Sequence, residues 1–132
     1  MDNLEVREYL ISLPLVEECQ PFGEESVVYT IGGKMFAAYI FARGEYLPVK
    51  CDPDRAVLLR DEFEAITPAW HFSKKHWNDL RFEILPEEIV RREIRHSYFT
   101  VIRKNVSPKA LREEILKEIA KAGLIDDAMS TE

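Results

Sequence analysis

Apolar side chains near the N-terminus recur every three or four residues, the spacing of one face of an α-helix. The members of this face are Val6, Tyr9, Leu10 and Leu13. Asp2 and Glu5 have the spacing of a capping box, and Pro14 stops the pattern because its ring cannot continue a helix. The sequence therefore predicts a helix before Pro14 and an acidic loop over residues 14–25.

The next part of the chain is rich in β-branched and aromatic residues, which favour strands. Three strands are predicted, over residues 26–31, 34–41 and 45–50. Gly32-Gly33 supplies the positive φ of a hairpin turn, and Arg43-Gly44 makes the following turn. Pro48 has no N–H to donate to a neighbouring strand, so we expect the third strand at an edge or at a bulge.

Three further helices follow from helical spacing and from proline and glycine at their ends. They are predicted from Asp52 (the cap, before Pro53) to about Glu64, from Pro86 to about Arg103, and from Ser107 (the cap, before Pro108) to Gly123. Their expected inward faces are Ala56, Leu59 and Phe63 with help from Val57; Val90, Ile94, Tyr98 and Val101; and Leu111, Ile115, Ile119 and Ala122.

Residues 68–78 combine both tryptophans of the chain with two histidines and two lysines. We predict a strand over Ala69–Ser73 with Trp70 and Phe72 on one face and His71 on the other. A second strand is predicted over Asn78–Ile84, where Leu80, Phe82 and Ile84 alternate with Asp79, Arg81 and Glu83. Lys74 to Trp77 would then form the turn that joins the two strands.

The order of these elements predicts an α+β fold, with an antiparallel sheet of about five strands backed by helices on one side. The chain of 132 residues has the length of one domain. No repeat or linker divides it, so we expect one domain over residues 1–125 and a flexible tail over residues 126–132.

The net charge of −6 argues against attraction of the whole surface to nucleic acid or to an anionic membrane. The charge is uneven, however. Residues 70–112 contain 10 basic and 5 acidic side chains, and the segments on either side are acidic. A basic block between acidic segments is either a solvated surface or a local site for an anionic partner.

Two cysteines without a CxxC pair, and an N-terminus without a basic or apolar leader, predict a reduced, cytoplasmic and soluble protein. No apolar run reaches the length that spans a membrane, so no membrane association is expected.

Three strings together resemble the MmcQ/YjbR family of small bacterial proteins: Gly32-Gly33-Lys34-Met35-Phe36-Ala37, Lys50-Cys51-Asp52-Pro53 and Lys74-Lys75-His76-Trp77-Asn78. The resemblance covers residues 1–120. It implies a frataxin (CyaY)-like fold and a DNA-binding role described as a double-wing motif. Ala69-Trp70-His71-Phe72 departs from the family's common Gly-Tyr-His-Met string, and Pro48 interrupts a strand that is normally plain.

We therefore predict a non-enzymatic DNA-binding protein that contacts the phosphate backbone weakly and without sequence preference. The expected contact residues are Lys34, Lys74, Lys75, His76, Trp77, Arg91, Arg92 and Arg95. Trp77 would either plug the core or stack on a base. Glu87 and Glu88 stand four residues before Arg91 and Arg92 and would compensate part of their charge.

Other functions have weaker support in the sequence. A metal site could draw on His71, His76 and Cys51, or on the acidic set Glu5, Glu8, Glu17, Glu18, Glu24 and Glu25, but neither has the spacing of a ligand motif. No GxSxG, P-loop, HExxH or GxGxxG string is present, so we expect no catalytic residues, no metal and no cofactor. The alternative function is a protein-interaction or regulatory module that binds no nucleic acid.

Overall fold

The computed structural model describes residues 1–126 of the chain. The elements are α1 (Asn3–Ser12), β1 (Glu17–Cys19), β2 (Ser26–Ile31), β3 (Lys34–Ile40), the 3₁₀ turn η1 (Phe41–Arg43), β4 (Tyr46–Lys50), α2 (Pro53–Glu62), β5 (Ile66–Pro68), β6 (Trp77–Arg81), α3 (Glu87–Lys104) and α4 (Lys109–Lys121). The predicted tail lies outside the described residues except for Asp126, which is buried and pairs with Arg103.

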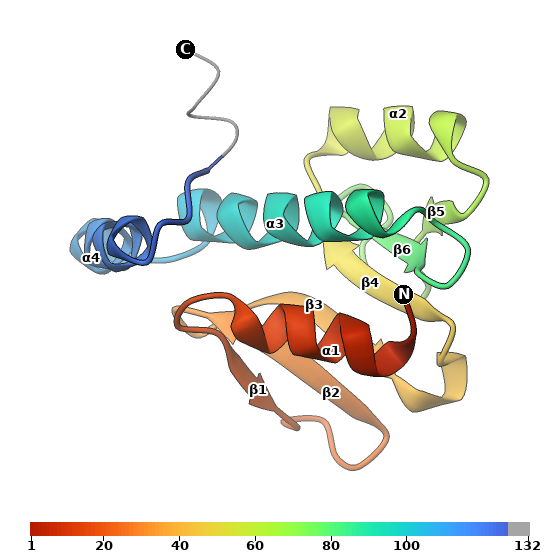
Figure 1. The fold of residues 1–132 in the computed structure, drawn as a ribbon, viewed down its shortest axis with the longest axis horizontal. Coiled ribbons are helices and arrows are strands. Elements are labelled where there is room, and N and C mark those ends of the chain that lie inside the picture. The colour runs from red at the N-terminus through yellow and green to blue at the C-terminus, as the bar shows by residue number, and fades with distance from the viewer. Residues whose placement is uncertain (127–132) are drawn as a thin grey trace.

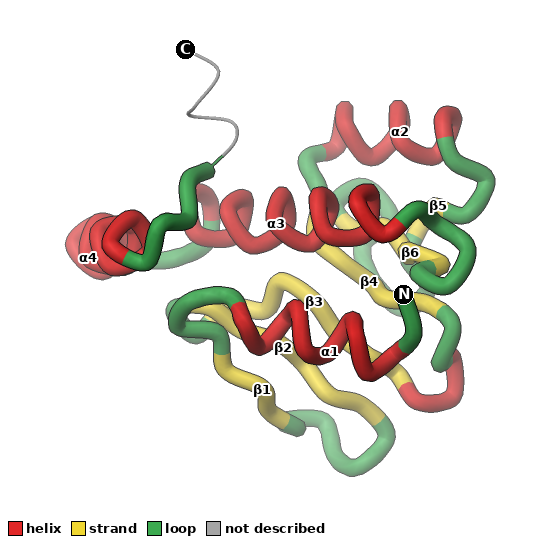
Figure 2. Tube along the Cα trace, in the orientation of Figure 1, coloured by secondary structure: helices red, strands yellow, loops and turns green. Residues whose placement is uncertain are grey.

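The strands form one antiparallel sheet in the order β1-β2-β3-β4-β6-β5. Figure 1 shows α1 and α3 in front of this sheet, and α4 beyond the C-terminal end of α3. Figure 2 shows the same layers coloured by type of element. The α+β class is confirmed, with six strands in residues 1–126 instead of about five. The comparison with frataxin stays a prediction.

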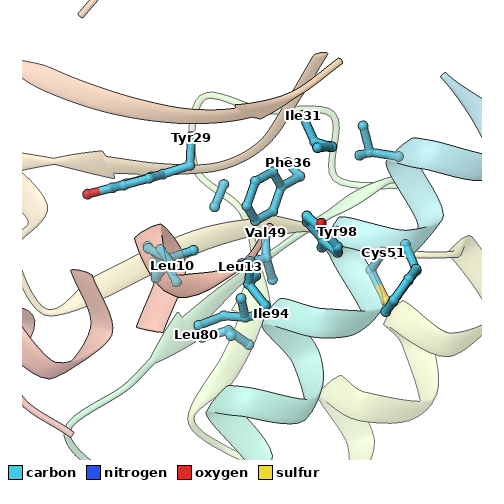
Figure 3. Close-up of a cluster of buried hydrophobic side chains, with 14 of the residues drawn as sticks. Leu10, Leu13, Tyr29, Ile31, Phe36, Val49, Cys51, Leu80, Ile94 and Tyr98 are labelled. Carbon is cyan, nitrogen blue, oxygen red and sulfur yellow. The ribbon is translucent and has the colours of Figure 1, made fainter. Parts of the chain in front are cut away.

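The core lies between the helices and the front of the sheet. The predicted stripe of α3, made of Val90, Ile94, Tyr98 and Val101, has no exposed surface. Figure 3 shows Leu10 of α1 and Leu13, which follows the last residue of that helix, meeting side chains of the sheet and of α3. Burial of each such aliphatic side chain stabilises the fold by about 1.5–3 kcal/mol.

Helix α3 is also tied to the sheet by hydrogen bonds. The Ser97 hydroxyl accepts from the Lys50 amide at 2.8 Å and donates to the Phe36 carbonyl at 2.5 Å, so it bridges β4 and β3. These strands otherwise pair at one position, Ala37 with Val49. The amide position of Pro48 faces the same side as that of Lys50, because the two are two residues apart in a strand. The backbone nitrogen of Pro48, which cannot donate, therefore faces β3, where few backbone hydrogen bonds join the two strands.

The expected edge position of Pro48 is wrong. Strand β4 lies inside the sheet and pairs along its length with β6, and Pro48 itself is buried. The short strand β1 was missed within the predicted loop. Its three residues are all exposed, so it has no apolar alternation that could reveal it.

The predicted strand over Ala69–Ser73 is also wrong. The strand is β5, Ile66–Pro68, and residues 69–76 form a loop in which His71 has a φ of +70°. Strand β6 does not alternate, because Asn78, Asp79 and Leu80 are all buried. Ile84, expected inside, is 59% exposed because the strand ends at Arg81.

The helices confirm one smaller expectation and correct four others. The α1 capping box is present, with the Glu5 amide 2.9 Å from Asp2 Oδ1. The Asp52 side chain does not cap α2, and Ser107 does not cap α4, whose N-cap residue is Pro108. Val57 and Ala122 are exposed instead of facing the core.

Candidate anion-binding surface

The predicted arginines of α3 are engaged with neighbouring groups. Arg91 Nη2 lies 3.3 Å from Glu87 Oε1, as expected from their spacing, and its guanidinium lies over the ring of Tyr9 at 4.8 Å. Arg95 donates to the Tyr9 hydroxyl at 3.5 Å. Both side chains therefore face α1.

Arg92 does not pair with Glu88. Its Nε donates to Glu93 Oε2 at 2.8 Å, and the same carboxylate receives two hydrogen bonds from Arg55 at 3.0 and 2.6 Å. Burial raises the pKa of Glu93, but the hydrogen bonds from the two arginines outweigh it and hold the pKa below its usual value. The carboxylate is ionised at neutral pH, so it compensates much of the charge of Arg55 and Arg92.

The loop of residues 69–76 carries the other predicted cations. Lys75 and His76 are exposed. Lys74 donates to the Ala69 carbonyl at 3.3 Å, and its own carbonyl accepts from Arg60 of α2. Lys34 is exposed at the β2–β3 turn.

The two tryptophans of the 68–78 stretch differ in exposure. Trp77 is 8% exposed and stacks on Phe72 with 4.7 Å between ring centroids, so it is buried outside the main core cluster and is not available to stack on a base. Trp70 is 49% exposed. Trp70 is not among the contact residues expected from the sequence, where its side chain was expected to lie in a strand.

A buried ion pair holds Trp70 in place. Asp79, which has no exposed surface, accepts from Arg43 Nη1 at 2.7 Å and from the Trp70 amide at 3.2 Å. The Arg43 guanidinium lies over the rings of Trp70 and Tyr46, at 5.0 and 4.5 Å. The loop therefore rests on a carboxylate that the strand pattern placed on the surface.

Beside the loop, three cationic or basic side chains converge from different elements. They line a cavity of about 230 Å³, which we call the basic pocket. Its lining residues are Lys50, Cys51, Asp52, Pro53, His76, Thr100, Lys104 and Asn105. The Cys51 amide donates to the His76 carbonyl at 2.8 Å, which holds the loop against the end of β4.

The basic pocket contains two lysines and one carboxylate. Lys50 Nζ donates to Asn105 Oδ1 at 2.8 Å, and burial, with a smaller contribution from the charge of Lys104, lowers the Lys50 pKa. Lys104 pairs with Asp52, whose pKa is lowered chiefly by that hydrogen bond. With two lysines and one carboxylate, the pocket keeps net positive charge at neutral pH.

The walls behind these charges are neutral. Burial is the largest cause that lowers the pKa of His96 to about 4, and its Nε2 accepts from the Asp52 amide at 3.4 Å. Cys51 is 2% exposed, and burial raises the pKa of its thiol to about 12. The thiol is protonated and unreactive, in line with its position at the end of a strand.

Within residues 1–126, no group of three or more His, Cys, Asp or Glu side chains is placed to hold a metal ion. None of the described helices is long and apolar enough to cross a bilayer.

The basic pocket is lined by Lys50-Cys51-Asp52-Pro53 and by His76, which belong to the strings quoted above. The sequence model of the YjbR family matches residues 11–100, more than half of the chain. The chain belongs to the YjbR family. The resemblance noted from the sequence is thereby confirmed.

One relative of this YjbR-family chain is the uncharacterized protein YbdF of Escherichia coli O157:H7, which is 36% identical over 94 residues, 70% of this chain and 77% of YbdF. The crystal structure of Deinococcus radiodurans protein DR2400, with a DUF419 domain, is similar with a TM-score of 0.78 and 30% identity, over 95% of this chain and 90% of that one. A Pseudomonas syringae protein shares the fold, with a TM-score of 0.64 and 18% identity over 74% of this chain and 96% of its own.

Proposed function

We propose that this YjbR-family protein is a non-enzymatic DNA-binding protein that contacts the phosphate backbone without sequence preference. The contact surface is the loop of residues 69–76 together with the basic pocket. The observation that carries this proposal is the convergence of Lys50, His76 and Lys104 on one cavity. Lys75 is exposed and immediately precedes His76 in the chain. Contacts to phosphate need cations within reach and little else, and they give affinity without reading sequence.

This proposal narrows the set of contact residues expected from the sequence. Arg91 faces α1, Arg92 shares the Glu93 carboxylate with Arg55, and neither lines the basic pocket, while Trp77 is buried; these observations argue against roles for the three side chains. Lys74, Lys75 and His76 stay in the set, and Lys50 and Lys104 join it. Trp70 adds an exposed aromatic ring on the same loop, a feature with which proteins stack unpaired bases.

Net charge limits the affinity. The chain carries −6 overall, so distant parts of the protein repel DNA while the local surface attracts it. We expect a Kd of roughly 10⁻⁴–10⁻⁶ M that weakens steeply with salt, as for other non-specific complexes.

Fluorescence anisotropy with a labelled oligonucleotide at low salt tests the proposal. Lys75→Glu should weaken binding and lower the slope of log K against log salt by about 1 or more. Arg91→Glu is the matched control, because it makes the same change of charge on a side chain that faces α1. Wild-type protein that binds neither duplex nor single strand at low salt, or equal loss in both variants, would refute the proposal. The first result would favour the interaction-module alternative.

A further inference from the structure

The basic pocket is a recess, and its cations do not all stand on an open surface. Lys50 is partly buried, and the hydrogen bond to Asn105 fixes the position of its ammonium group. Lys104 reaches in from the end of α3, while His76 stands exposed in the loop that forms another wall. An anion bound here must enter the cavity between these elements.

The start of α2 opens into the same recess. The first N–H groups of a helix have no partner within it and are commonly satisfied by a side chain. No side chain caps α2, because the carboxylate of Asp52 is turned to Lys104. Since Asp52 and Pro53 line the pocket, the positive end of a 10-residue helix adds to the two lysines there.

The remaining lining favours a compact anion with several acceptors. The Thr100 hydroxyl and the Asn105 amide offer neutral polar groups, and Asp52 is the one carboxylate in the lining. A phosphomonoester carries about −1.5 to −2 at pH 7 and presents three acceptor oxygens. An internal phosphodiester carries one charge and has a sugar on each side, so it contacts the cations at the mouth of the recess but does not present three oxygens to its interior.

We infer that the basic pocket receives the terminal phosphate of a DNA strand, an inference that rests on the proposed function. In this arrangement Lys50 and Lys104 contact the phosphate oxygens, and Lys104 is shared with Asp52. The N-terminal end of α2 borders the recess at Asp52 and Pro53. The first linked sugar remains at the mouth, near His76. Internal phosphates of the strand then follow the loop past Lys75.

The test compares one oligonucleotide sequence with a 5′-phosphate, a 3′-phosphate or hydroxyl groups at both ends, each as a single strand. We expect at least one phosphorylated form to bind about tenfold tighter than the hydroxyl form, the gain from one charge-assisted contact. Lys50→Gln and Lys104→Gln should each reduce this ratio toward one. Arg91→Gln removes the same charge about 20 Å away along α3 and should leave the ratio unchanged.

Each outcome has a distinct meaning. Equal binding of all three strands overturns the terminal-phosphate inference and leaves the proposed DNA binding standing. Absence of binding to every strand at low salt overturns both. Adenosine monophosphate distinguishes a free nucleotide from a strand end as the source of the phosphomonoester. Competition of the nucleotide with the phosphorylated strand supports the inference. Binding of the nucleotide without binding of any strand contradicts it. Circular dichroism melting of both lysine variants verifies that they are folded.

Discussion

Helix α3 has a group of cationic side chains near each end, and the two groups differ in what surrounds them. Near its N-terminus, Arg91 and Arg92 contact carboxylates, and Arg91 and Arg95 contact Tyr9. Near its C-terminus, Lys104 meets Lys50 and His76 around a cavity with a single carboxylate. The N-terminal group has more cationic side chains close together in the sequence, yet it is less available to an anion. The density of charge along a chain does not show which side chains from other elements will contact those charges.

The two tryptophans show the same contrast, because Trp77 is buried and Trp70 is exposed on the surface. Their substitution is expected to give the largest difference in stability. Trp77→Ala should lower the free energy of unfolding by about 3–5 kcal/mol, because it empties a buried site stacked against Phe72. Trp70→Ala should cost far less, since about half of the ring is already in water. Urea unfolding of both variants measures the difference, and similar losses would contradict the assigned roles.

The group at the N-terminal end should be structural. Glu93→Gln removes the buried charge that two arginines share, and we expect a loss of about 3 kcal/mol, the low end for breaking a buried pair because Arg55 is partly exposed. Asp52→Asn is the corresponding change at the pocket and should cost under about 1 kcal/mol, as both Asp52 and Lys104 are half exposed. If the denaturant midpoint fell more for Asp52→Asn than for Glu93→Gln, the structural role assigned to the Glu93 ion pair would be contradicted.

How much of this could be predicted depended on where the determining contacts lie. The stripe of α3 and the capping box of α1 are local patterns, and both were predicted correctly. The first part of the loop, residues 69–73, was predicted as a strand, because its conformation depends on Asp79, a carboxylate buried under Trp70 and Arg43. In a strand, charged residues usually alternate with apolar ones and face solvent. The sequence therefore predicted that Asp79 would be exposed.

The basic pocket illustrates the same limit for function. Lys50 was visible within a string that resembles the family, yet nothing in the sequence joins it to Lys104, which is 54 positions further along. The two meet because Ser97 ties α3 to the ends of β3 and β4. This tertiary contact, with the hydrogen bond from Lys50 to Asn105, brings the two separate lysines to one cavity.

The stability of the protein should depend on pH through His96, the neutral imidazole behind the pocket. The pKa of His96 is about 4 in the folded protein against 6.5 as its usual value, with burial as the main cause. Between these values the unfolded state binds more protons, so stability should fall as the pH is lowered from about 6.5 to about 4. We expect a loss of about 2 kcal/mol over that range, reduced from the full shift because the ring is partly solvated.

The His96→Gln variant is the control for this pH dependence, since glutamine does not titrate and can still accept from the Asp52 amide. Thermal melts at several pH values should show a flatter profile for the variant above about pH 4. Below that range, ionised carboxylates with lowered pKa values, such as Glu93 and Glu18, add their own losses in both proteins. Parallel profiles of the two proteins would mean that His96 is solvated and that the wall is not neutral.

The smallest expected effect tests the arginines directly. Glu87→Gln removes the carboxylate beside Arg91, an exposed pair four residues apart, and should change stability by less than about 0.5 kcal/mol. If the N-terminal end of α3 lies outside the DNA contact, the added positive charge should change affinity by less than about twofold at moderate salt, where exposed charges are screened beyond about 10 Å. An increase in affinity with a salt slope steeper by about 1 would instead show that Arg91 reaches a phosphate. The anion-binding surface would then extend along α3, as the charge pattern of the sequence first indicated.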